Sequence, residues 1–298
     1  DTDISASAAA TVPPQSSHDW KKDMTPRPAA LALLGSIAVA GLLAGCSASG
    51  NTSDVSFTPN VTTDVPAAAN EVEDVRWNLP NGEPTSLDPA LSAVESNSTV
   101  VGNLCEALLT PTVTGENLPG LATSVERTDD VTYVIQLREG VAFWDGAPMT
   151  AEDVVFSIER VLQPELGSSW AGWSLQGVDS VEATGDLEVT VVLSSPNALL
   201  EQYLATPAFT VVEKAFAEQA GTSFGTAEGG VMCTGPYKLG EWKSGSEITI
   251  QRNDGWWNTE ASPKVGQYTF SFTTDPAAQA AALRSGDLDG SWGVPVSQ

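Results

Sequence analysis

The chain has 298 residues, with 38 acidic side chains against 13 basic ones and a formal net charge of −25. A surface this acidic repels phosphate backbones, which argues against binding to nucleic acid. The single histidine, His18, lies before the region that is expected to fold. Catalytic triads that use histidine and imidazole metal sites are therefore excluded from the folded region. A pair of catalytic carboxylates stays open in principle, and no cofactor is expected.

The segment that begins at Met24 is interpreted as an export signal. A basic residue, Arg27, precedes an apolar run over 29–44, and the run leads into Leu-Ala-Gly-Cys, which ends at Cys46. A positive region, an apolar region and small residues in this order are typical of a secretion signal. The last four residues resemble the bacterial lipobox, which implies that Cys46 becomes the lipidated first residue of the mature protein. A plain membrane anchor is the alternative, since the run approaches the ~20 residues that span a bilayer.

The residues on either side of the signal are not expected to belong to a folded domain. Residues 1–23 precede the predicted signal peptide (24–45) and are interpreted as not native to the protein, because an export signal works from the chain end. Residues 46–70 are rich in Ser, Thr, Pro and Ala, with little to bury. They are interpreted as a flexible tether.

From Glu71 onward, segments with strand and helix patterns alternate, which predicts an α/β or α+β fold. The clearest helix covers 151–162, where Val154, Ile158 and Val161 share one face and Thr150 is placed to cap the first turn. A second helix begins at Asp275-Pro276 and stops at Gly286. Shorter helices are predicted over 98–109, 197–205 and 213–220, and strands over 74–79, 132–137, 178–183, 188–193, 237–242, 247–252 and 265–272.

Four ordered blocks of residues resemble one known family. The longest runs from Pro119 to Arg160 and contains Leu-Arg-Glu-Gly and Phe-Trp-Asp-Gly. The other three are Leu-Asp-Pro-Ala at 87–90 with Glu-Ala-Leu-Leu at 106–109, Thr-Gly-Pro-Tyr-Lys-Leu at 234–239 with Trp-Trp at 256–257, and Ala-Ala-Leu-Arg-Ser-Gly-Asp-Leu-Asp at 281–289. Together they resemble the bacterial extracellular solute-binding proteins of family 5. These are the oligopeptide-, dipeptide- and nickel-binding proteins of ABC importers.

The resemblance implies a periplasmic-binding-protein-like fold of type II, in which two lobes joined by a hinge close over a ligand. Lobe I would cover 71–264 and be nearly complete, with an inserted subdomain at about 115–221. Lobe II would begin at 265, and only its start (265–298) would be present, so we expect a truncated second lobe. The recognised blocks themselves are expected to build turns and caps rather than to touch the ligand.

The candidate ligand residues follow from the same resemblance, because family members bind peptides largely through main-chain hydrogen bonds. The segment after Leu-Asp-Pro commonly contributes, and here it contains Ala93, Val94, Glu95 and Ser96. Glu95 could face a ligand amine or could be a solvated loop acid. Trp170 and Trp173 are candidates for an aromatic wall over the ligand, with packing inside the inserted subdomain as the alternative. Trp256 and Trp257 are expected to fill the core of lobe I.

The chain has three cysteines, and their wide spacing suits neither a zinc site nor a CxxC redox motif. Besides Cys46 there are Cys105 and Cys233, which could bridge in an exported protein. Either of them could instead pair with a cysteine beyond Gln298.

The resemblance implies a lipoprotein outside the cytoplasm that catalyses no reaction and is held on the outer face of the cytoplasmic membrane by Cys46. As a monomer it would capture oligopeptides or dipeptides and deliver them to an ABC permease with its ATPase. Capture of nickel or of a nickel–metallophore chelate is the alternative within the family. The missing histidine weakens direct metal binding but not chelate uptake. A secreted hydrolase and a signalling receptor that reuses the fold are alternatives from other classes.

Overall fold

The computed structural model describes residues 70–293, which belong to one compact unit of the chain. The expected upstream segment, signal peptide and lipidated Cys46 lie outside these residues, as does the tether up to residue 69. Within the described part of the chain, no helix has both the length and the apolar character to cross a membrane.

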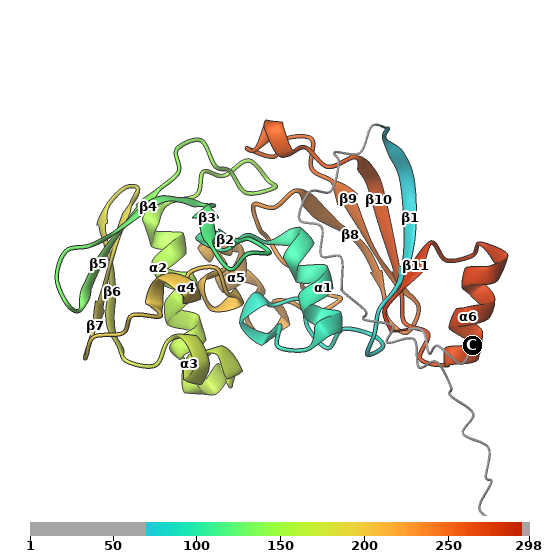
Figure 1. Ribbon diagram of the computed structural model, residues 1–298, viewed down its shortest axis with the longest axis horizontal. Coiled ribbons are helices and arrows are strands. Elements are labelled where there is room, and N and C mark those ends of the chain that lie inside the picture. The colour runs from blue at the N-terminus through green and yellow to red at the C-terminus, as the bar shows by residue number, and fades with distance from the viewer. Residues whose placement is uncertain (1–69, 294–298) are drawn as a thin grey trace, which may run out of the picture. The chain divides into compact units, whose positions relative to one another are not determined.

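A five-stranded sheet contains both ends of the described chain (Figure 1). Its order is β11-β1-β10-β9-β8. β10 pairs in parallel with β1 and antiparallel with β9, so that Tyr268 lies opposite both Val75 and Ile250. The strands are β1 (Val72–Asn78), β8 (Tyr237–Lys243), β9 (Glu247–Arg252), β10 (Val265–Ser271) and β11 (Gly290–Ser291).

The position of β10 corrects the expected boundary between the lobes. Its Phe270 is buried in the same apolar cluster as Leu79 and Ile250. A boundary between Lys264 and Val265 would cut through this sheet, so Val265 does not begin a separate lobe in this structure. The pairing of β10 with β1 joins segments far apart in the sequence, and local strand patterns carry no signal of such a partner.

A four-stranded antiparallel sheet, ordered β4-β5-β7-β6, forms the second sheet and lies in the range of the expected inserted subdomain. Alternate residues of its central strands face the core, among them Ile135 and Val191. Helix α2 (Ala151–Leu162) packs on this sheet with Val154 and Ile158 buried. The strands are β4 (Ala122–Arg127), β5 (Thr132–Leu137), β6 (Val178–Gly185) and β7 (Glu188–Leu193).

Helices α1, α2 and α5 lie between the two sheets (Figure 1), with α2 against β6 and α1 against β8. The predicted helix over 98–109 is wrong in its bounds, because α1 runs from Glu95 to Leu104. Cys105 has an extended backbone, and the chain then enters the short hairpin of β2 and β3. The remaining elements are β2 (Leu109–Pro111), β3 (Asn117–Pro119), α3 (Ser169–Ser174), α4 (Leu200–Tyr203), α5 (Lys214–Ala220) and α6 (Pro276–Ser285).

A disulfide between Cys105 and Cys233 ties the end of α1 to the loop before β8. Both cysteines are buried. The two segments also share a hydrogen bond, from the Gly235 amide to the Leu104 carbonyl at 3.0 Å. A Cβ atom on Gly235 would lie 2.3 Å from that carbonyl oxygen. Glycine is therefore required at this position by the close approach of the two backbones.

A buried ion pair connects η1 (Pro89–Leu91) to α2. Arg160 Nη2 lies 2.6 Å from Asp88 Oδ2, and the side chains are 14% and 2% exposed. The Asp88 carboxylate also accepts the amide hydrogen of Ala90, which caps η1. On its other side the Arg160 guanidinium lies 4.8 Å from the centre of the Phe224 ring. The ion pair therefore lies between two apolar clusters, one that contains Ala90 and the four-stranded sheet and one that contains Phe224 and the five-stranded sheet.

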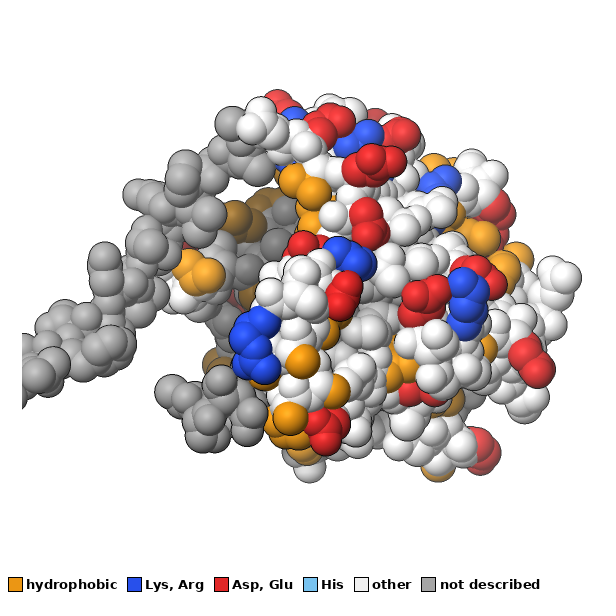
Figure 2. Space-filling view, turned by 90° about the vertical axis from the view of Figure 1, so that its right-hand side faces the viewer, with side chains coloured by type: hydrophobic (Ala, Val, Ile, Leu, Met, Phe, Trp, Pro, Cys, Tyr) orange, Lys and Arg blue, Asp and Glu red, His pale blue; other side chains and the backbone are white. Residues whose placement is uncertain are grey.

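The surface charges are distributed rather than gathered on the face that carries α6. Figure 2 shows acidic and basic side chains interspersed there. One exposed ion pair on the β1–β11 edge joins Arg76 to Asp289 at 3.9 Å.

Candidate functional site

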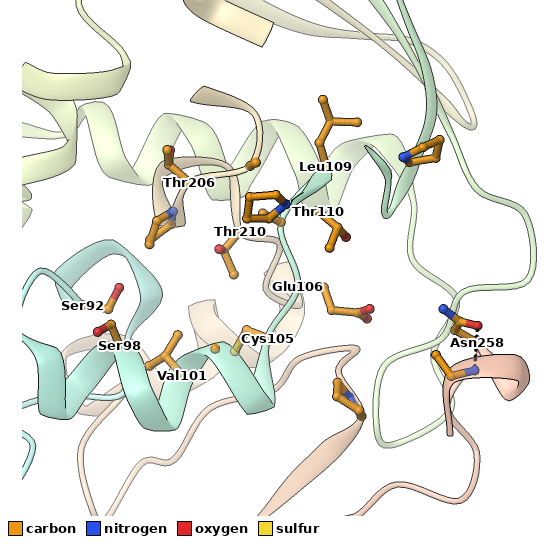
Figure 3. Close-up of a pocket in the computed structure, with 18 of the residues that line it drawn as sticks. Ser92, Ser98, Val101, Cys105, Glu106, Leu109, Thr110, Thr206, Thr210 and Asn258 are labelled. Atoms are coloured by element: carbon orange, nitrogen blue, oxygen red, sulfur yellow. Dashed lines mark hydrogen bonds between the residues drawn. The ribbon is translucent and has the colours of Figure 1, made fainter. Parts of the chain in front are cut away.

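A cavity of about 490 Å³ runs along one face of α1 (Figure 3). Ser98, Val101 and Gly102 line it from α1, because residues three and four apart share a helix face, and Cys105 lines it just after the helix ends. The opposite wall is the segment 205–210, and Asn258 lies at the far end beyond the carboxylate of Glu106. The residues that line it are Ser92, Ser98, Val101, Gly102, Cys105, Glu106, Ala107, Leu109, Thr110, Pro111, Pro119, Ala205, Thr206, Pro207, Thr210, Pro236, Trp256, Trp257, Asn258 and Ala261.

Glu106 is the single side chain that can carry a charge among the described residues lining this cavity. Its Oε2 accepts two hydrogen bonds, from Thr234 Oγ1 at 2.8 Å and from Trp257 Nε1 at 3.0 Å. Thr234 is fully buried in the loop before β8. One carboxylate oxygen therefore links the α1–β2 connection to the loop before β8 and to the segment after β9.

Burial raises the pKa of the Glu106 carboxyl above its ordinary value. The Thr234 hydroxyl, the indoles of Trp257 and Trp256, and the charge of Arg138 act in the opposite direction without cancelling this effect. Arg138 is held over the ring of Trp257 at 4.4 Å and donates a hydrogen bond to the Gly120 carbonyl at 2.9 Å. The Arg138 guanidinium therefore stacks on the indole, and none of the ion pairs among the described residues includes Glu106.

The raised pKa predicts how replacement of Glu106 changes the pH dependence of stability. The folded state holds the proton of Glu106 more tightly than the unfolded state does. The contribution of Glu106 to the free energy of unfolding therefore falls as the pH rises from the ordinary pKa to the raised one. In Glu106→Gln this loss disappears. We expect the stability of the variant, measured relative to the parent by urea unfolding, to improve as the pH is raised above the ordinary carboxyl pKa.

The control for that experiment is Glu126→Gln, which removes an exposed acid from β4. Its stability relative to the parent protein is expected to change little over the same pH range. A Glu106→Gln curve that runs parallel to the parent curve would contradict the assignment of a raised pKa.

The predicted ligand segment at 93–96 leads into α1, at the end of the helix where Ser92 and Ser98 line the cavity. Ala93, Val94 and Glu95 are exposed, whereas Ser96 is buried. The Ser96 hydroxyl accepts the amide hydrogen of Asn81 at 3.0 Å, so this side chain holds the preceding loop. The Glu95 carboxylate accepts a hydrogen bond from the Asn81 side chain at 3.3 Å.

The two predicted tryptophans stand on α3, beside η1. Ser168, the residue before α3, donates a hydrogen bond to the Ala90 carbonyl at 2.6 Å. Trp170 packs against the apolar cluster that includes residues of α2. Trp173 is 66% exposed, and its ring meets the ring of Trp170 edge to face, with 5.7 Å between the ring centres. The structure therefore places both predicted groups next to η1, and neither group lines the cavity.

The expectation that Trp256 and Trp257 fill the core holds only in part, since Trp257 packs against a core cluster as a partly buried residue. Both are half-buried and line the cavity beside Glu106. Glu106 was not among the predicted site residues, since it stood within a predicted helix. The signal that could have found it is a lone acid inside the apolar run Cys-Glu-Ala-Leu-Leu, because acids are seldom buried without a partner.

The sequence profile of the bacterial extracellular solute-binding proteins, family 5 Middle, matches residues 117–298. This chain belongs to that family. It is 29% identical over 271 residues to the periplasmic oligopeptide-binding protein OppA of Escherichia coli strain K12. The alignment covers 85% of this chain and 48% of the relative. The chain thus spans about half the length of the curated relatives it matches.

Solved structures show the same fold. Haemophilus influenzae OppA in complex with the peptide RPPGFSPFR aligns with a TM-score of 0.69 and 26% identity, over 77% of this chain and 48% of that one. NikZ from Campylobacter jejuni in complex with Ni(L-His) aligns with a TM-score of 0.65 and 25% identity, over 73% of this chain and 43% of that one. The chain therefore has the type II periplasmic-binding-protein fold, as the resemblance implied.

Proposed function

We propose that this solute-binding protein captures oligopeptides or dipeptides outside the cytoplasm and delivers them to an ABC permease with its ATPase. It acts as a monomer and catalyses no reaction. The observation that carries the proposal is the cavity along α1, in a family member whose relatives include oligopeptide- and dipeptide-binding proteins. The cavity volume of about 490 Å³ lies within the range of small-molecule sites.

The lining of the cavity suits a ligand that alternates apolar and hydrogen-bonding groups. Val101, Pro207 and Trp256 offer apolar surface, while Ser98 and Thr206 offer hydroxyl groups. A peptide carries amides and side chains in such alternation, and hydroxyls can pair with its main chain. We place Ala93 to Ser96 and the two tryptophans of α3 at the outer border of the same site, because both groups flank η1.

The proposal also includes the membrane attachment and the domain plan. Cys46 is the lipidated residue that holds the protein on the outer face of the cytoplasmic membrane, with 46–70 as its tether. The sheet β4-β5-β7-β6 with α2 is the core of the inserted subdomain at about 115–221.

A second candidate ligand is a nickel chelate, and the likeness to NikZ in complex with Ni(L-His) favours it. Among residues 70–293, no group of three or more His, Cys, Asp or Glu side chains is arranged to hold a metal ion. The proposed cargo in this case is the chelate, with the metal already coordinated by its carrier.

A thermal-shift screen of the full-length protein separates these ligands. We expect di- and oligopeptide pools at about a hundred times their dissociation constant to raise the melting temperature by about 5 to 10 °C. Nickel chloride alone, nickel with excess histidine, and free amino acids serve as the comparison. Stabilisation by nickel–histidine alone would replace peptides by the chelate as the cargo, and no response to any pool would reject both.

A further inference from the structure

The charge of Glu106 has no partner inside the cavity. Its one engaged oxygen, Oε2, accepts from neutral donors, the Thr234 hydroxyl and the Trp257 indole. No hydrogen bond joins Oε1 to another described group, although the indole of Trp256, whose buried Nε1 has no acceptor of its own, lies near enough to lower the pKa of Glu106. A carboxylate taken out of water needs compensation by a cation or by hydrogen bonds to both oxygens. This carboxylate has such compensation on one side only.

A purely structural role would not need a charge here. A neutral amide at position 106 could accept the same two hydrogen bonds through its oxygen and would avoid the desolvation cost of an anion. The burial that raises the pKa of Glu106 is the sign of that cost. Figure 3 shows the carboxylate of Glu106 among the residues that line the cavity.

The charges around Oε1 decide whether a cationic or an anionic group of a ligand can bind there. No basic side chain lines the cavity, and Arg138, whose charge acts on Glu106, is held on the ring of Trp257. Trp256 and Trp257 border the same end of the cavity. The guanidinium of Arg138 on the Trp257 ring shows that an indole here can hold a cation. An anionic ligand group would meet a like charge without any compensating cation.

We propose that the Glu106 end of the cavity is a subsite for an ammonium group of the ligand. The ammonium donates a hydrogen bond to Oε1 while Oε2 stays with Thr234 and Trp257. This inference rests on the proposed function, and for a peptide it means a lysine side chain that reaches between Glu106, Trp256 and Trp257. The same subsite disfavours a glutamate side chain at that position of the peptide.

Three tripeptides test this by isothermal titration calorimetry on the full-length protein: Ala-Lys-Ala, Ala-norleucine-Ala and Ala-Glu-Ala. Norleucine has the lysine carbon chain and lacks the amine. We expect the lysine peptide to bind about tenfold or more tightly than the norleucine peptide, because a hydrogen bond between charged groups is lost in the latter. The glutamate peptide should bind more weakly than either.

Two variants test whether the lysine preference depends on Glu106. In Glu106→Gln the ratio of the lysine-peptide affinity to the norleucine-peptide affinity should fall to about one. Glu126→Gln, which removes an exposed acid elsewhere, should keep the full preference. The parent protein gives a second readout that needs no variant: lowering the pH protonates Glu106, so the lysine preference should shrink while norleucine binding holds.

The results that would overturn the ammonium subsite differ from those that would overturn peptide capture. Equal binding of lysine and norleucine peptides, or a lysine preference that survives in Glu106→Gln, overturns the subsite and leaves peptide capture standing. The same holds for a lysine preference that does not change with pH. Failure of all three tripeptides, together with failure of the longer pools in the thermal-shift screen, overturns peptide capture and the subsite with it.

Discussion

Replacing Cys105 and Cys233 together by alanine is expected to lower the free energy of unfolding by about 4 to 5 kcal/mol. The bridge closes a loop across a sequence separation of 128 residues, and the entropy that it removes from the unfolded chain grows with that length. The total stability of a domain is about 5 to 15 kcal/mol, so this loss is large. Urea unfolding of the oxidised parent and of the double variant measures it.

The chemical control for the disulfide is the parent protein reduced while unfolded and then refolded and measured in the presence of reductant. It should match the double variant. Because both cysteines are buried, reductant alone is expected to act slowly on the folded protein. Equal denaturation midpoints for the parent and the double variant would show that the bridge contributes nothing to stability.

Replacing Arg160 by methionine is expected to cost about 3 to 5 kcal/mol. Methionine keeps much of the length that packs near Phe224, but it leaves the Asp88 carboxylate, 2% exposed, without its cation. Removing one partner of a buried pair is costly because the other charge stays behind in a medium of low polarity. The measurement is again equilibrium unfolding.

The matched control is Lys214→Met. It breaks the ion pair between Lys214 and Glu152, whose side chains are 40% and 67% exposed, and should cost less than about 1 kcal/mol. Adding Asp88→Asn to Arg160→Met removes the stranded charge and should recover part of the loss. Equal losses in Arg160→Met and Lys214→Met would refute the importance of burial for this pair.

The local pattern of apolar and polar residues predicted the bounds of those helices and strands whose ends are set by their own residues. The helix predicted over 151–162 is α2 to the residue, since its apolar face repeats at helical spacing and Thr150 pairs with Asp153 at its start. The strands predicted over 132–137, 188–193 and 247–252 are β5, β7 and β9 without change. The helix that ends at Gly286 does so with that glycine in the left-handed conformation, as expected.

The remaining misses have physical causes that lie outside the local sequence. β4 escaped prediction because most of its side chains are exposed, so the strand carries little apolar signal. The end of α1 was misplaced because apolar residues continue to Leu109, whereas the chain leaves the helix at the disulfide of Cys105 and enters a hairpin. The cavity is assembled from five separate stretches of chain, and only the folded structure brings Trp257 to Glu106.

A crystal structure of the full-length protein with a peptide from the thermal-shift screen would locate the bound solute directly. We expect the peptide to lie along α1, between Ser98 and Trp257, with any lysine ammonium within hydrogen-bond distance of Glu106 Oε1. A peptide bound elsewhere, with the cavity along α1 left empty, would contradict the assignment of this cavity as the solute site.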